Sequence, residues 1–91
     1  MDFEWNDAKA AGNLSKHQVP FEYAARAFLD PLRVDEPDER HEYGEDRCIT
    51  MGKIEGRVFV VAYVMRGHSI RLISARKANE REQKRYHTFS A

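Results

Sequence analysis

The sequence of 91 residues has one cysteine, Cys48, and therefore no pair that can close an internal disulfide bond. Stable disulfides are a feature of oxidising compartments, and a lone cysteine gives no indication of one. No apolar run approaches the roughly 20 residues of a membrane-spanning helix, and the opening MDFEWNDAK lacks the basic and apolar regions of a signal peptide. We therefore expect a cytoplasmic protein.

Motifs for several kinds of enzyme chemistry are also missing. There is no Gly-rich phosphate-binding loop and no G-x-S-x-G nucleophile motif. Metal-binding residue types crowd positions 41–48, but their spacing matches no zinc pattern, and Cys48 has no histidine in a recognisable arrangement beside it. We expect no metal and no cofactor, and we interpret Cys48 as a small buried side chain on a strand.

The net charge is zero, with 15 basic and 15 acidic residues, yet the two signs are unevenly distributed. Residues 65–91 contain seven Lys or Arg and two acids, which gives +5, whereas residues 1–64 contain eight bases and thirteen acids, which gives −5. A concentration of positive charge attracts polyanions such as nucleic acids. The C-terminal third is therefore the first place to search for a functional surface.

A single small domain is expected over residues 1–91, because two cores would each be too small to be stable. The hydrophobic fraction of 42% is typical of a soluble globular protein. The predicted class is α+β with a mainly antiparallel sheet. Its expected parts are a short N-terminal strand, a helical hairpin, a three- to four-stranded meander and a C-terminal helix.

Capping and alternation signals place the elements of the N-terminal half. The segment DFEW alternates apolar and acidic residues and predicts a short strand. Asn6 can cap a helix over DAKAAGNLSKH, and Pro20 suits the start of a second helix, FEYAARAFLD, which Asp30-Pro31 ends. The polar and acidic residues 37–46 predict a surface loop.

The C-terminal half predicts strands at about 47–51, 57–65 and 69–75, with turns at 52–56 and 66–68. Asn79 and Glu82 form a capping-box pattern at the start of a helix over ANEREQKRYH. Strict alternation on the third strand puts Ile70, Leu72 and Ser74 on one face and Arg71, Ile73 and Ala75 on the other.

Basic residues on this strand and the following helix suggest a phosphate-binding surface. Guanidinium groups bind phosphate through paired hydrogen bonds, so we expect Arg71 and Arg76 to bind it and Lys77 to assist. Tyr86 or His68 would transfer protons, because metal-independent RNA cleavage needs a base and an acid beside the cations. The helix adds further cations for RNA binding: Arg81, Lys84 and Arg85.

Structural interpretations stand beside these functional ones. The basic residues of a terminal helix are often a solvated face. Arg71 can pair with an acid of the N-terminal half, Tyr86 can anchor its helix against the sheet, and His68 can be a polar turn residue.

Two separated segments are more specific than the charge pattern. FEWNDAKAAGNLSKHQVPFEYAARAFLDPLR followed by RLISARKANEREQKRY resembles the BrnT family of type II toxins. The resemblance implies a compact RelE-like fold and translation arrest through metal-independent cleavage of RNA. It also implies a BrnA-like antitoxin with a ribbon-helix-helix part, which together with the toxin would bind operator DNA and repress the operon.

The resemblance also assigns motif positions to individual residues. The closing motif covers Arg71, Ser74, Arg76 and Tyr86, and the opening motif covers Trp5, Lys9, Asn13, Lys16, His17, Phe21 and Glu22. Lys16 and His17 join the RNA-binding candidates, although both residue types also suit the negative end of a helix dipole.

Two residues depart from the motif. Asn6 replaces the usual Asp, which is nearly neutral for a helix cap. Gln18 replaces a Gly, which argues against a left-handed helix end at that residue.

Three functions are compatible with these residues. The first is an RNA-cleaving toxin. The second is a non-catalytic module that binds nucleic acid or a protein partner through the same basic face. The third is a co-repressor subunit whose bases chiefly contact an acidic antitoxin segment.

Overall fold

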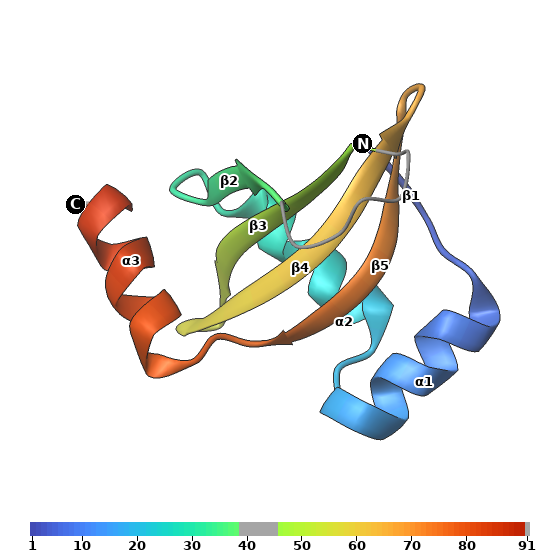
Figure 1. Cartoon of the computed structure of the whole chain (residues 1–91), viewed down its shortest axis with the longest axis horizontal. Helices are drawn as coiled ribbons and strands as arrows, with labels where there is room; N and C mark the ends of the chain where they lie inside the picture. The colour runs from blue at the N-terminus through green and yellow to red at the C-terminus, as the bar shows by residue number, and fades with distance from the viewer. Residues whose placement is uncertain (39–45, 91) are drawn as a thin grey trace.

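A five-stranded sheet forms the centre of the computed structural model, which describes residues 1–38 and 46–90 (Figure 1). The strand order is β1-β5-β4-β3-β2; β1 is parallel to β5, and every other pairing is antiparallel. The strands are β1 Asp2–Glu4, β2 Val34–Pro37, β3 Arg47–Ile54, β4 Arg57–Arg66 and β5 Ser69–Lys77, and the helices are α1 Asp7–His17, α2 Phe21–Ala24, the 3-10 helix η1 Ala25–Leu29 and α3 Glu80–Ser90. The predicted α+β class is confirmed.

The segment around β2 and the following loop differs from the prediction. β2 pairs with β3 at the sheet edge, but its sequence VDEP has too little apolar alternation to predict a strand. Most of the expected surface loop, including His41, Glu42 and Glu45, lies outside the described residues. No helix among the described residues is long and apolar enough to cross a membrane.

The two faces of the sheet are covered differently. The first face packs against α1, α2 and η1 through an aromatic core in which the Phe28 ring lies 5.4 Å from Phe3 and 5.0 Å from Tyr63, centroid to centroid. On the second face, α3 covers one end through a smaller cluster: Met51, Val58, Val60, Ala78 and Tyr86. Figure 1 shows α1 and α3 at opposite sides of the sheet. Part of the second face is therefore not covered by α3.

A β-bulge in β5 changes which side chains share a face. Tyr63 pairs with Leu72 while the preceding Ala62 pairs with Ser74, so Ile73 is an extra residue. The predicted strict alternation is therefore wrong after Leu72: Ala75 joins the buried core of the first face, and Ser74 lies on the second face. The bulge also puts Arg71 and Arg76 on the same face.

The ends of α1 are set by local hydrogen bonds. Asn6 caps the helix as predicted, because its side chain accepts the Lys9 N–H at 3.0 Å. Gln18 ends it in the left-handed conformation, with φ 61° and its N–H donated to the Leu14 carbonyl. The expectation that Gln18 does not form a left-handed helix end is therefore wrong, and the cap forms although a residue with a Cβ adopts this conformation at an energetic cost.

The region around η1 differs from the prediction in two ways. The predicted second helix is α-helical only over Phe21–Ala24 and continues as a 3-10 helix. β3 extends to Ile54, and Gly52 lies within it rather than in the predicted turn. A Cβ on Gly52 would lie 2.4 Å from the Ala27 carbonyl oxygen, so glycine allows η1 to pack directly on the strand.

Candidate functional site

Arg71 lies on the second face of the sheet and pairs with an acid, as the structural interpretation suggested. Its Nη1 donates to Glu4 Oε2 at 2.9 Å, between the parallel neighbours β5 and β1. Among the described residues this is the one partner of its guanidinium, and an arginine carries several N–H donors. Arg71 therefore keeps donors that can bind a phosphate.

Arg76 is held more completely. Nη1 and Nη2 donate to the two carboxylate oxygens of Glu82 at 2.7 and 2.8 Å. These hydrogen bonds raise the pKa of the Arg76 guanidinium. Glu82 also forms the predicted capping box, because it accepts the Asn79 N–H at 2.9 Å while Asn79 accepts the Glu82 N–H at 2.8 Å. The Arg76 side chain therefore fixes the start of α3 to the end of β5.

Tyr86 occupies the position of a helix anchor. Its side chain is 3% exposed within the cluster under α3, and its hydroxyl donates to Asp30 Oδ2 at 2.5 Å. Burial raises the pKa of the Asp30 carboxyl, but hydrogen bonds from Tyr86 and from the backbone N–H groups of Lys53 and Leu32 outweigh burial and hold the pKa below its usual range. The hydroxyl thus has a structural partner inside the fold.

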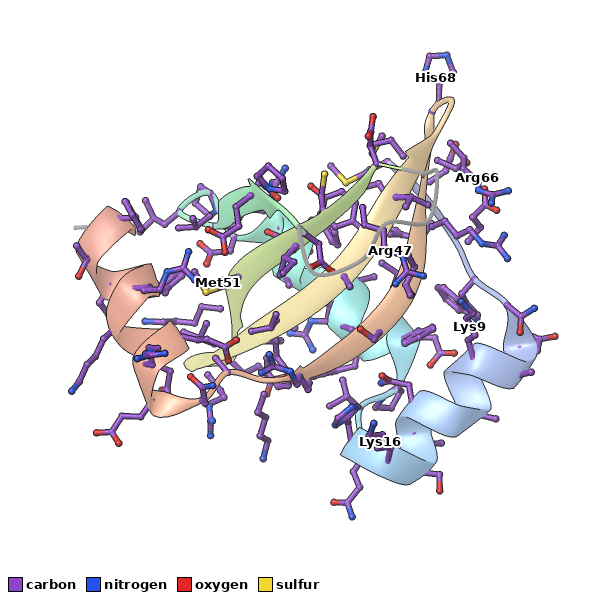
Figure 2. The ribbon with its side chains drawn as sticks, in the orientation of Figure 1. Lys9, Lys16, Arg47, Met51, Arg66 and His68 are labelled. Atoms are coloured by element: carbon purple, nitrogen blue, oxygen red, sulfur yellow. The ribbon has the colours of Figure 1, made fainter. Side chains whose placement is uncertain are left out.

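His68 is separated from the other three predicted catalytic residues. It lies at the exposed tip of the β4–β5 hairpin (Figure 2). Arg71 and Arg76 pair with Val64 and Val60 of β4, which puts them about 13 Å apart along the sheet. His68 lies beyond Arg71, on the side away from Arg76. The structure therefore does not bring the predicted catalytic set to one point.

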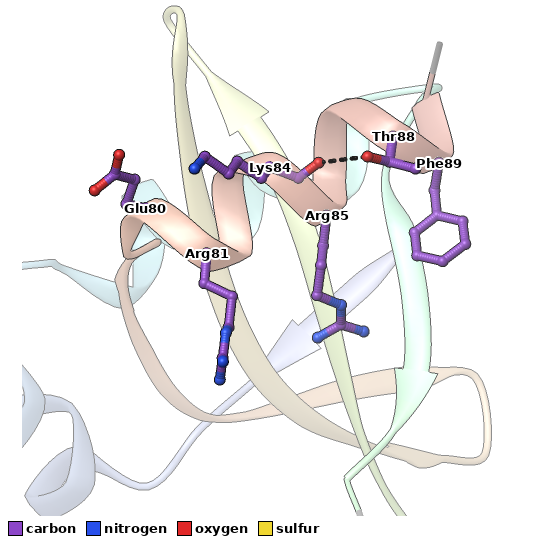
Figure 3. A pocket seen from close by; sticks show the side chains of 6 residues that line it. All are labelled: Glu80, Arg81, Lys84, Arg85, Thr88 and Phe89. Atoms are coloured by element: carbon purple, nitrogen blue, oxygen red, sulfur yellow. Dashed lines mark hydrogen bonds between the residues drawn. The ribbon is translucent and has the colours of Figure 1, made fainter.

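The cations of α3 form a strip along one helix. A depression of about 620 Å³ is bordered by α3 residues alone: Glu80, Arg81, Lys84, Arg85, Thr88 and Phe89 (Figure 3). Arg85 pairs with Glu36 of β2, and the Phe89 ring is 66% exposed. A depression bordered by one helix cannot enclose a substrate. With Lys77 at the exit of β5, this strip is an open cationic surface rather than an enclosing cleft.

A second cationic region lies where α1 meets the sheet. Lys9, Lys16 and His17 of α1 face Arg47 of β3 and Ser74 of β5 across a groove of about 320 Å³. Figure 2 shows Lys9, Lys16 and Arg47 on the α1 side of the molecule, whereas Met51 lies toward α3. No acid is among the described residues that line this groove.

Asn13 fixes the position of α1 beside this groove. β1 pairs only with residues 69–71 of β5, so the β5 edge is unpaired farther along. There the buried Asn13 amide donates to the Ala75 carbonyl at 2.9 Å and accepts the Ala75 N–H at 2.9 Å, as a neighbouring strand would. It also donates to the Val19 carbonyl at 3.0 Å. These bonds hold Lys9, Lys16 and His17 at the sheet edge.

Residues 5–82 match the family model described as the ribonuclease toxin, BrnT, of type II toxin–antitoxin systems. The chain belongs to the BrnT family. No curated protein matches the chain. The family consists of ribonuclease toxins, and a type II system pairs each toxin with an antitoxin. The observed fold is compatible with a RelE-like arrangement.

The BrnT match covers the groove completely and α3 only in its first turn. It begins at Trp5, includes Lys9, Lys16, His17 and Arg47, and ends at Glu82. Arg47 was missing from the predicted site. No sequence motif marks it, and its place beside α1 becomes visible only through the pairing of β3 with β4. Among the described residues there is no group of three or more His, Cys, Asp or Glu that could hold a metal ion.

Proposed function

We propose that this chain is a metal-independent endoribonuclease that cleaves RNA and thereby arrests translation. The observation that carries the proposal is the BrnT family match across residues 5–82. Half-buried arginines on the second face of the sheet and exposed cations on α3 support it, since RNA binding requires contacts to phosphates. The proposed activity needs access to RNA and ribosomes, which places the protein in the cytoplasm.

The proposed partner is a BrnA-like antitoxin with a ribbon-helix-helix part. The type II system supports an antitoxin, and the proposed complex would bind operator DNA through that part and repress its own operon. In this proposal the toxin contributes no base-reading contacts to DNA. Operator occupancy would therefore depend on the antitoxin being present.

The proposed RNA contacts differ in how much of each side chain is available. Arg71 would bind and stabilise a phosphate, because its contact with Glu4 uses one nitrogen. Arg76 would contribute its charge from within the pair with Glu82. Flexible cations at the strand exit and on α3 would contact the RNA backbone: Lys77, Arg81, Lys84 and Arg85.

The decisive experiment incubates the purified chain, freed from any partner, with a defined RNA in excess EDTA. Cleavage by the parent, reduced by about tenfold or more in Arg71→Ala, is the expected result. Arg26→Gln is the matched control, because it removes one positive charge from an exposed pair with Glu55 on another part of the surface. Arg76→Ala is compared at equal folded fraction, since it also loosens α3.

Two results would contradict the proposal. RNA that stays intact in EDTA but is cut when Mg²⁺ is added would remove metal independence. RNA that is never cut, with or without ribosomes, but is retarded on a gel in a salt-dependent manner would support the non-catalytic binding module instead.

A further inference from the structure

Lys9 and Lys16 bring positive charge to the groove beside α1, and no acid is among the described residues that line it. Lys9 and Lys16 lie two helical turns apart, about 10 Å along the axis, and neither forms an ion pair with a described residue. Both ammonium groups are on flexible exposed side chains. Arg47 enters the same groove from the sheet. Four basic residues on one concave wall, counting His17, fit a polyanion better than any neutral ligand.

Strand register extends this wall across the sheet. Val64 pairs with Arg47 on one side and with Arg71 on the other, so the two arginines flank it in one row on the second face. Their Cα atoms are about 10 Å apart, which is two strand spacings. Ser74, brought to this face by the bulge, adds a hydroxyl that can donate to a phosphate oxygen. The α1 groove and Arg71 thus belong to one continuous surface.

His17 is the one imidazole side chain among the described residues that line this groove. It is half-buried at the last turn of α1, next to Lys16. Imidazole is the side chain best suited to exchange protons near neutral pH. His68 has no such surroundings, because it lies on a hairpin tip, and Tyr86 is committed to Asp30.

We infer that the α1 groove is the active site of this ribonuclease, with Lys9, Lys16 and Arg47 binding phosphates and His17 acting as the general base. This inference rests on the proposed function. His17 takes the proton of the ribose 2′-hydroxyl, and the 2′ oxygen forms a bond to phosphorus while the bond to the 5′ oxygen breaks. Water protonates that 5′ oxygen, and the hydroxide so formed takes the proton from imidazolium. The products are a 2′,3′-cyclic phosphate and a 5′-hydroxyl.

Binding and cleavage are tested separately with two oligonucleotides of the same sequence. The first is RNA, and the second carries 2′-deoxy sugars and cannot be cleaved by this route. Lys16→Gln and Arg47→Gln should each weaken binding of the second oligonucleotide by several fold and lower the slope of log K against log salt by about 1. Arg26→Gln, the charge-matched control, should change neither quantity.

His17→Gln addresses the chemical step. It should bind the uncleavable oligonucleotide within about twofold of the parent and cleave the RNA about 10²- to 10⁴-fold more slowly. His87→Gln is the comparison histidine, because His87 lies on α3 and is not among the residues that line the groove, and it should cleave within about twofold of the parent. Circular dichroism and thermal melting confirm that each variant is folded.

The outcomes separate this inference from the proposed function. A folded His17→Gln protein that cleaves at the parental rate overturns the assignment of the base while the ribonuclease stands. If Lys16→Gln and Arg47→Gln bind the uncleavable oligonucleotide with the affinity of the parent while Lys84→Gln loses binding, the RNA site lies on α3. That result overturns the assignment of the groove as the active site. A parent that cleaves no RNA removes the proposed function itself.

Discussion

The arginines around β5 and α3 and the lysines of the α1 groove differ in how they pair with acids among the described residues. Around β5 and α3, three of the arginines predicted to bind phosphate are paired with acids: Arg71 with Glu4, Arg76 with Glu82 and Arg85 with Glu36. In the α1 groove, no acid is among the described lining residues. The region with more bases in the sequence is therefore the one in which more of the charge serves the structure.

This difference shows that a count of charges along a chain does not measure the field at a surface. Glu4 and Glu36 belong to the acidic N-terminal portion, yet the sheet order brings them beside the basic C-terminal third. Ion pairs between the two portions of the sequence therefore neutralise part of the charge asymmetry. Each pair is at least partly exposed and stabilises the fold only modestly, but each changes what a phosphate can reach.

The largest expected effect comes from separating α1 from the sheet. Asn13→Ala removes three buried hydrogen bonds and leaves the Ala75 N–H and carbonyl without their partner. The free energy of unfolding should fall by about 2–4 kcal/mol. Urea denaturation measures this loss, and hydrogen exchange should show weaker protection in α1 while α3 stays as protected as in the parent.

Asn79→Ala is the matched control for this change. It removes an asparagine cap from α3, which should cost about 1 kcal/mol and loosen that helix rather than α1. Equal losses of stability in the two variants, or exchange that rises in both helices alike, would contradict the view that α1 is held at the sheet edge mainly by Asn13.

A smaller effect is expected where α3 is anchored. Tyr86→Phe keeps the ring in its cluster and removes the hydroxyl that donates to Asp30. Stability at neutral pH should fall by about 1–2 kcal/mol. Because the Asp30 carboxyl has a lowered pKa, the stabilisation that it provides is complete above the unfolded-state pKa and is lost as pH falls through the folded-state pKa. The gap between parent and variant should therefore narrow below about pH 4.

RNA cleavage by Tyr86→Phe decides between its two interpretations. An anchor that only stabilises α3 leaves the cleavage rate of folded protein within about threefold of the parent, whereas loss of a proton-transfer group costs about 10² or more. A fully stable Tyr86→Phe protein with no cleavage would return Tyr86 to the catalytic set and weaken the contrast between the two regions.

The sequence predicted the parts of the fold that depend on local signals. The α1 cap at Asn6, the capping box of Asn79 and Glu82 and the long apolar strand β4 follow from neighbouring residues, and the structure confirms them. The bulge at Ile73 and the edge strand β2 were missed, because both depend on which strand lies alongside. No pattern within one strand contains that information.

The candidate site shows the same limit. Arg71 and Arg76 were predicted on the correct strand, but their acids come from β1 and α3, so their pairing could not be derived from spacing along β5. Arg47 was missed because it meets α1 only through the sheet register. Lys16 and His17 were identified through the family resemblance. Their shared groove required the fold.

The smallest expected effect concerns the end of α1, where Gln18 adopts the left-handed conformation. Gln18→Gly should stabilise the protein by about 0.5–1 kcal/mol, because glycine has no Cβ to oppose a positive φ and this gain exceeds its greater freedom in the unfolded chain. Gln18→Ala is the control, since it keeps the Cβ and should change stability little. Because glycine keeps the left-handed conformation at this position, the Val19 carbonyl still accepts from Asn13, and RNA cleavage should be unchanged. A gain in the alanine variant equal to that in the glycine variant would show that the glutamine side chain, rather than the backbone conformation, limits stability here.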